Sequence, residues 1–99
     1  MGLSIARAGA DYATTHTPLG GGSPHINSPY ASNSNTVLIN GLSAIAVGDV
    51  TQCGEIAITG SSTVYVNGRA AHCNGNMLDS HEYSWTPSVC VASGTVYAG

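Results

Sequence analysis

A pattern that occurs twice constrains the fold of this chain more than any other feature. The first copy, TVLINGLSAIAVGD at residues 36–49, reads as two short strands joined by an Asn-Gly turn. Asn-Gly between apolar runs is the strongest short-range signal for a β-hairpin, because both turn positions adopt a positive φ. The second copy, TVYVNGRAAHCNGN, occupies residues 63–76. Two copies in 99 residues indicate a repeat architecture.

The two ends of the chain match the two halves of the same pattern. TVYAG at residues 95–99 is similar to the outgoing strand, and LSIARAG at residues 3–9 is similar to the returning strand LSAIAVG. Joined, the ends would form a third hairpin whose break falls at the turn. We therefore expect an all-β body of short strands and hairpins with pseudo-threefold symmetry, in which long loops converge at one end.

The period-two alternation of strands sorts the hairpin residues between two faces. One apolar face of the first hairpin is expected to point inward, and it consists of Val37, Ile39, Leu42 and Ala44. In the second copy Cys73 falls on this inward face as a small buried hydrophobe. His72 falls on the opposite face, and we expect it at the strand surface. A disulfide between Cys73 and Cys90 is an alternative that a reducing compartment disfavours.

Composition limits the classes of function that this chain can have. Only 7% of the residues are charged and only two are Lys or Arg, which argues against binding to nucleic acid or to an anionic membrane surface. Apolar residues make up 42%, so the low charge does not indicate disorder. The N-terminus lacks the long apolar core of a signal peptide. We expect one domain over residues 1–99, without an extension domain, assembled in the cytoplasm.

The loops that follow the three hairpins carry metal-ligand side chains at similar positions. The ligand types lie five to seven residues after Gly9, Gly48 and Gly75, at His16, Cys53 and His81. Loops that converge on one axis would bring these side chains together. Imidazole and thiolate suit Zn²⁺, which takes four tetrahedral ligands in a closed structural site. His25 is the best fourth ligand, because it shares a loop with His16.

Other interpretations stand beside the zinc site. A single loop histidine is usually a solvated side chain. Catalysis would need a nucleophile with a base or paired carboxylates, and Asp11, Asp49 and Asp79 fit Asx turns better, so we expect no enzyme. A small metal-free β binding module, for carbohydrate or adhesion, is the main alternative. Four aromatic residues in loops would serve it by stacking on sugars: Tyr12, Tyr30, Tyr83 and Trp85.

Four segments together resemble the PAAR-repeat proteins, which form the sharpened spike tips of type VI secretion systems and contractile phage tails. These segments are TVLING, TVYVNG, IAVGDVTQCG and IARAGADYATTH, and the resemblance covers nearly the whole chain. The sequence also departs from the family pattern. No copy keeps the family's Pro, only Arg7 keeps its Arg, and Asn76 stands where the family has Asp.

The resemblance implies a conical body with zinc bound near its point. By position, His16, Cys53 and His81 correspond to the family's loop ligands, whereas His25 falls on no motif position. The broad base of the family docks on the blunt end of a trimeric VgrG-type β-helical spike protein, one tip per trimer. In this chain the spike-binding base would consist of Leu3, Asn40, Gly41, Leu42, Asn67, Gly68 and Arg69.

The resemblance also implies a mechanical role. Such a tip caps the central spike and pierces the target envelope, with transient contact to the target membrane. It would end in the tail tip of a phage virion or be secreted with the injection spike. Effector proteins that ride with some family members are a further class of partner.

Overall fold

The computed structural model describes residues 2–33 and 35–98, and its strands are all short and antiparallel. The predicted all-β class is confirmed. One short helical turn, α1 (Ser80–Tyr83), accompanies nine strands among the described residues. The strands are β1 (Leu3–Ser4), β2 (Tyr12–Ala13), β3 (Ser28–Pro29), β4 (Leu38–Ile39), β5 (Leu42–Ser43), β6 (Tyr65–Val66), β7 (Arg69–Ala70), β8 (Cys90–Val91) and β9 (Tyr97–Ala98).

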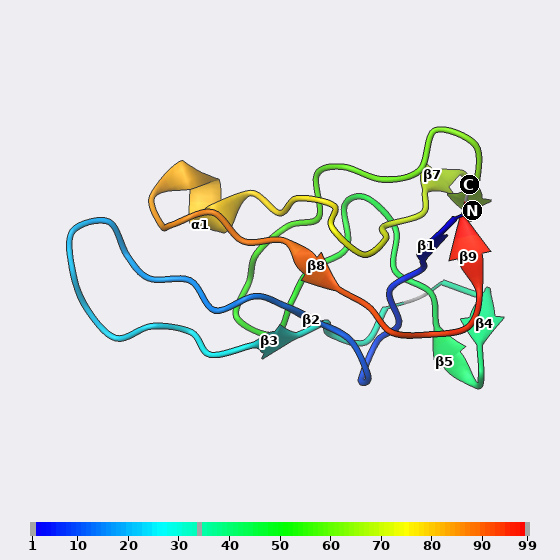
Figure 1. Ribbon diagram of the computed structural model, residues 1–99, viewed down its shortest axis with the longest axis horizontal. Helices are drawn as coiled ribbons and strands as arrows, with labels where there is room; N and C mark the ends of the chain where they lie inside the picture. The colour runs from blue at the N-terminus through cyan, green and yellow to red at the C-terminus, as the bar shows by residue number, and fades with distance from the viewer. Residues whose placement is uncertain (1, 34, 99) are drawn as a thin grey trace.

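Three strand pairs gather at one end of the molecule (Figure 1). β4 pairs with β5 and β6 pairs with β7, each across an Asn-Gly turn in which Asn40 or Asn67 has a φ near 50°. β1 pairs with β9, with Leu3 opposite Ala98, so the two ends of the chain form the third pair as predicted. The break itself, at Gly99 and Met1, lies outside the described residues.

The returning strands of the three hairpins are joined in a closed ring of backbone hydrogen bonds. The Ile45 N–H donates to the Ala6 carbonyl, the Ala6 N–H to the His72 carbonyl, and the His72 N–H to the Ile45 carbonyl, each over 2.9 Å. A second set of bonds runs around the axis in the opposite direction over 2.8–2.9 Å: Ala8 N–H donates to Ser43, Val47 N–H to Ala70 and Asn74 N–H to Ser4. Each hairpin therefore contacts the other two through equivalent positions, as a threefold repeat requires.

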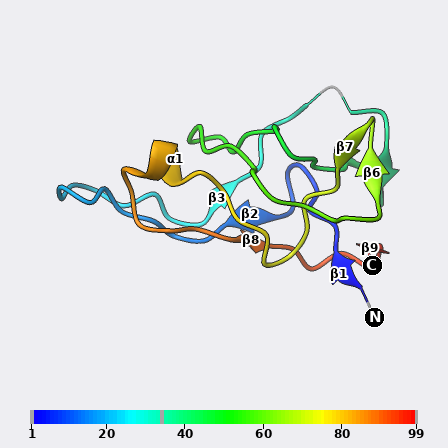
Figure 2. The ribbon, with the colours of Figure 1, turned by 90° about the horizontal axis from the view of Figure 1, so that it is seen from above.

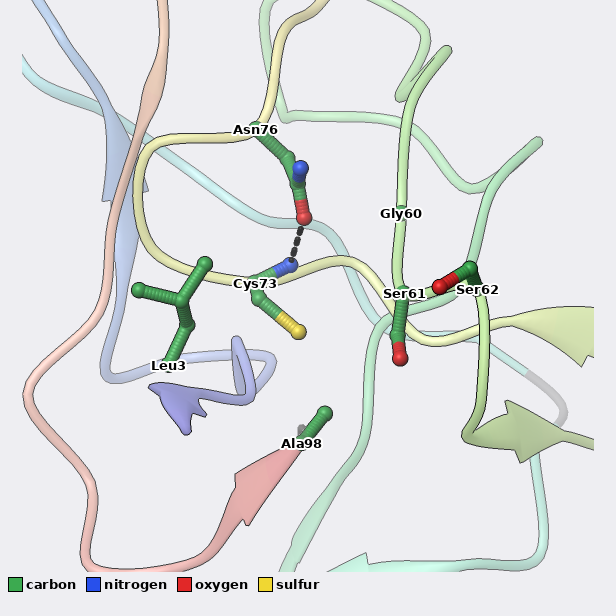
Figure 3. Close-up of a pocket in the computed structure, with 7 residues that line it drawn as sticks. All are labelled: Leu3, Gly60, Ser61, Ser62, Cys73, Asn76 and Ala98. Atoms are coloured by element: carbon green, nitrogen blue, oxygen red, sulfur yellow. Dashed lines mark hydrogen bonds between the residues drawn. The ribbon is translucent and has the colours of Figure 1, made fainter. Parts of the chain in front are cut away.

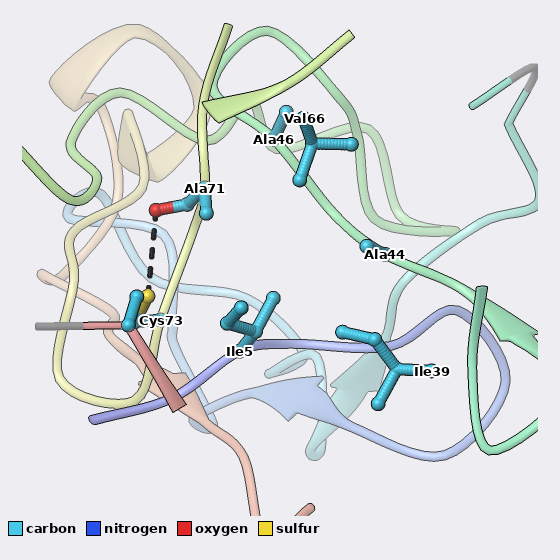
Figure 4. Close-up of a cluster of buried hydrophobic side chains, with 8 residues drawn as sticks. Ile5, Ile39, Ala44, Ala46, Val66, Ala71 and Cys73 are labelled. Atoms are coloured by element: carbon cyan, nitrogen blue, oxygen red, sulfur yellow. Dashed lines mark hydrogen bonds between the residues drawn. The ribbon is translucent and has the colours of Figure 1, made fainter. Parts of the chain in front are cut away.

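The first hydrophobic core lies inside this ring (Figure 4). Small side chains dominate it, and its members are Ile5, Ile39, Ala44, Ala46, Val66, Ala71, Cys73 and Ala98. Each outgoing strand buries in this core only the residue next to the turn. The predicted inward face is therefore only partly right. Ile39 and Ala44 are buried and Leu42 is half-buried, but Val37 is 41% exposed.

The prediction that His72 lies at the strand surface is wrong. His72 is fully buried, because the long loop of residues 9–35 covers the outer face of its strand. Its Nδ1 donates to the Thr59 carbonyl over 2.8 Å, and its Nε2 accepts from the Tyr30 hydroxyl over 2.7 Å. Burial lowers the pKa of His72 and raises that of Tyr30, which favours this neutral pair.

A second core, between the ring and the long loops, explains that burial. Its members are Ala6, Ala8, Ala13, Tyr30, Ile45, Leu78, Cys90 and Ala92. The returning strands are thus buried on both faces, with Ala44, Ile45 and Ala46 all fully inaccessible. Cys73 and Cys90 are buried and free, so the disulfide alternative does not occur.

The segment that follows Gly9 forms strands of its own. β2 pairs with β3 on one side and with β8 on the other, in a sheet ordered β3–β2–β8. The body measures 37 × 23 × 22 Å, with the hairpins at one end and α1 at the other (Figures 1 and 2).

Among the described residues, no helix has the length and apolar character needed to cross a membrane.

Two neighbouring residues of β4 test this packing. Ile39 is 3% exposed and Leu38 is 62% exposed. Ile39→Ala should lower the free energy of unfolding by about 2–4 kcal/mol, because it leaves a cavity inside the ring. Leu38→Ala should cost less than about 1 kcal/mol. Equal losses in denaturant titrations of the two variants would contradict the packing described.

Candidate metal centre

Four side chains from three separate loops converge at the end opposite the hairpins. They are the four predicted ligands, His16, His25, Cys53 and His81, and their ligand atoms all lie within 4.8 Å of one another. His16 and His25 occupy the two arms of the β2–β3 hairpin, Cys53 lies in a turn, and His81 lies in α1. His16 is buried and the other three are half-buried. This cluster could hold a metal ion.

Four of the six distances among the ligand atoms match one tetrahedral ion. With bonds of about 2.0 Å to nitrogen and about 2.3 Å to sulfur, tetrahedral zinc places nitrogens about 3.3 Å apart and sulfur about 3.5 Å from each nitrogen. His25 Nδ1 lies 3.3 Å from Nε2 of His16 and 3.3 Å from Nε2 of His81. Cys53 Sγ lies 3.5 and 3.7 Å from the same two Nε2 atoms.

The backbone and a second hydrogen bond fix the orientation of His16. Its N–H and C=O exchange hydrogen bonds with His25 over 3.1 and 2.9 Å, which places the two imidazoles side by side. Its Nδ1 donates to the Thr14 carbonyl over 2.8 Å. The lone pair of neutral His16 is therefore on Nε2, which faces the cluster. A hydrogen bond to the outer ring nitrogen is the usual support of a metal-bound histidine.

Trp85 packs against the open side of the cluster. Its ring stacks on His25 with centroids 4.3 Å apart and lies 4.6 Å from the ring of His81. Burial, together with the nearby imidazoles of His16 and His81, lowers the pKa of His25, which favours the neutral form that binds metals. Trp85 was not among the predicted site residues. Its bridge to Pro18, which sets it here, has no signal in the sequence.

The turn that carries Cys53 also supplies a hydrogen-bond donor to its sulfur. Thr51 Oγ1 accepts the N–H of Glu55 over 3.0 Å, so its own proton is free for Cys53 Sγ at 3.2 Å. Thr51 is buried, and its hydroxyl holds the sulfur from the protein side of the turn. The sequence offered no signal for this role of Thr51.

His81 is held on a strained turn. All four residues of α1 have a left-handed backbone, with φ between 51° and 65°. For residues with a Cβ this costs roughly 1–2 kcal/mol each. The Asp79 carboxylate accepts the N–H of His81 over 3.2 Å and the N–H of Ile56 over 2.9 Å, which ties the turn to the Cys53 loop. A bond from His81 to a metal ion would offset part of this strain.

No protein-family model matches this chain, and a search of curated proteins finds no matching sequence.

Asp11, Asp49 and the two arginines form hydrogen bonds and ion pairs within the fold. Of the three predicted Asx turns, Asp79 forms one, because it accepts the N–H of His81 two residues on. Asp11 and Asp49 instead accept the N–H of Arg7 and Ala46, four and three residues earlier in the chain. The Arg7 guanidinium pairs with Asp11 at 2.9 Å. Arg69 pairs with Asp49 at 2.9 Å, so this member of the predicted base also links two hairpins.

Two of the four aromatic residues expected of a carbohydrate module are used inside the protein, whereas Tyr83 is 69% exposed. Tyr30 is 1% exposed and bonded to His72, and Trp85 stacks on His25. A cavity of about 200 Å³ lies at the hairpin end, bordered by Leu3 and Ala98 and by the segment 60–62 (Figure 3). None of the described residues that line it is charged. It is separate from the metal-ligand cluster.

The three cysteines should differ sharply in reactivity. Burial raises the pKa of the Cys90 thiol to about 12 and also raises that of Cys73, so both stay protonated and unreactive at mildly alkaline pH. In the native metal-free protein, iodoacetamide should label Cys53 alone, and added Zn²⁺ should protect it. Peptide mass spectrometry reads out the sites. Labelling of the buried pair, or no protection by Zn²⁺, would contradict the site.

Proposed function

We propose that this chain is the tip of the central spike of a contractile injection machine, a type VI secretion system or a phage tail. The observation that carries the proposal is the closed ring of backbone hydrogen bonds among Ala6, Ile45 and His72. It gives a single chain three equivalent hairpins. A monomer built in this way can cap a trimer, because each hairpin can contact one subunit of the partner in the same manner.

The hairpin end has an exposed apolar surface with the same repetition. Leu38, Tyr65 and Tyr97 occupy equivalent positions of β4, β6 and β9 and are 62%, 60% and 58% exposed. Apolar and aromatic side chains are typical anchors of protein interfaces. We infer that these three residues, with the predicted base around them, dock on a trimeric VgrG-type β-helical spike protein.

The other end would be the point, and we propose that Zn²⁺ closes it. The supporting observation is that four of the six distances among the ligand atoms match a tetrahedral zinc sphere. At this end the chain consists of loops, with little apolar core between them. A structural ion links three loops in place of such a core.

The proposed mechanism is mechanical. The chain assembles in the cytoplasm on its spike and leaves the cell with it, and the narrow zinc-bound end meets the target envelope first. Force from the contracting sheath is then concentrated on a small area. A closed four-ligand site suits this role, because it leaves no open position for a substrate.

Mixing with a spike trimer tests the docking. The purified chain and the trimeric β-helical spike protein encoded beside it should form a complex of one tip per three spike subunits, measured by native mass spectrometry. Leu38→Glu should weaken the complex about tenfold or more, because it places a charge in an apolar interface. Leu19→Glu is the matched control, since Leu19 is 67% exposed near α1. Another stoichiometry, or equal effects of the two variants, would refute the docking.

A further inference from the structure

Glu55 is a buried carboxylate with one oxygen that lacks a hydrogen-bond donor among the described residues. Its side chain is fully inaccessible, and its Oε2 accepts a hydrogen bond from the Ser88 hydroxyl over 2.7 Å. Its Oε1 has no hydrogen-bond donor in the described protein and lies 3.3 Å from Nε2 of His16. An ionised carboxylate buried without a compensating charge is strongly destabilising.

The partner of Oε1 is not the imidazole N–H when His16 is neutral. Nδ1 of His16 already donates to Thr14, so its Nε2 presents a lone pair to Glu55. The ligand atoms of Cys53 and His25 lie 3.5 and 3.3 Å from the same Nε2. Electron pairs from these atoms therefore face one small space, and a bound cation would make the arrangement favourable.

The repeat makes Glu55 exceptional. The same backbone hydrogen bond occurs in each of the three loops. The N–H groups of Tyr30, Ala57 and Cys90 donate to the carbonyls of Asp11, Asp49 and Asn76, so these three donors occupy corresponding positions. The residues two positions before these donors therefore also correspond to one another. They are Ser28, Glu55 and Ser88, and all three are buried. Two copies thus place a serine at this position, and the third places a carboxylate beside the cluster of His16, His25, Cys53 and His81.

We propose that Glu55 is the charge-balancing residue of the metal centre. A divalent ion with one thiolate and three neutral imidazoles has a net charge of +1, and the Glu55 carboxylate brings this buried assembly to zero. Glu55 is not one of the four converging ligands, so it acts through space and through His16, held in place by Ser88. This inference rests on the zinc site of the proposed function.

The test compares Glu55→Gln with Glu82→Gln. Glutamine keeps the shape of Glu55 and an oxygen for the Ser88 hydroxyl, but removes the charge. Glu82 is exposed and adjacent to His81, so its substitution removes the same formal charge near the same ion. Zn²⁺ affinity is measured by competition with a chromophoric chelator at fixed pH and ionic strength. Glu55→Gln should weaken Zn²⁺ binding about tenfold or more, and Glu82→Gln should have less than a twofold effect.

The stability of the metal-free proteins separates this role from a merely structural one. Without metal, Glu55→Gln should melt at the same temperature as the parent or higher, since it removes a buried charge. If the variant melts lower without metal, or binds Zn²⁺ like the parent, or if both variants lose affinity equally, the assignment of Glu55 is wrong. If the parent itself binds no Zn²⁺, the zinc site of the proposed function fails, and this inference fails with it.

Discussion

Three backbone hydrogen bonds around one axis, between Ala6, Ile45 and His72, are the constraint on which the rest of the structure depends. They require three strands from distant parts of the chain to approach one another closely. Alanine or cysteine at Ala44, Ala46, Ala71 and Cys73 permits that approach, and the inner core is correspondingly small. Once the ring is closed, the turns all point to one end, and the loops after Gly9, Gly48 and Gly75 leave toward the other.

The end formed by the loops then has to be stabilised by something other than hydrophobic burial. Backbone bonds between His16 and His25 hold one loop, and the Asp79 carboxylate holds another. The left-handed turn at residues 80–83 costs free energy. A metal ion bound by residues of all three loops would supply stabilisation where the core is thinnest. With a metal ion bound, the cluster would therefore contribute to the stability of the fold as well as being a candidate functional site.

Features determined by neighbouring residues, such as turns and strand pairs, could be predicted from the sequence. Contacts between residues far apart in the sequence could not. The Asn-Gly turns determine the pairing of β4 with β5 and of β6 with β7, because turn type fixes register over two residues. The repeat then paired β1 with β9 and aligned the loops that bring Cys53, His16 and His81 together. His72 was misplaced because its burial depends on Tyr30, a contact across 42 positions of sequence. Glu55 and Trp85 were missed for the same reason, since a carboxylate or indole in a loop carries no local sign of what will cover it.

The central claim is that three loops meet on one zinc ion at the end opposite the hairpins. X-ray absorption at the zinc edge, on protein purified without added chelator, tests it most directly. The account predicts about one zinc per chain, coordinated by three nitrogen atoms at about 2.0 Å and one sulfur atom at about 2.3 Å. Protein that retains no zinc, or zinc whose coordination shell lacks sulfur, would contradict it.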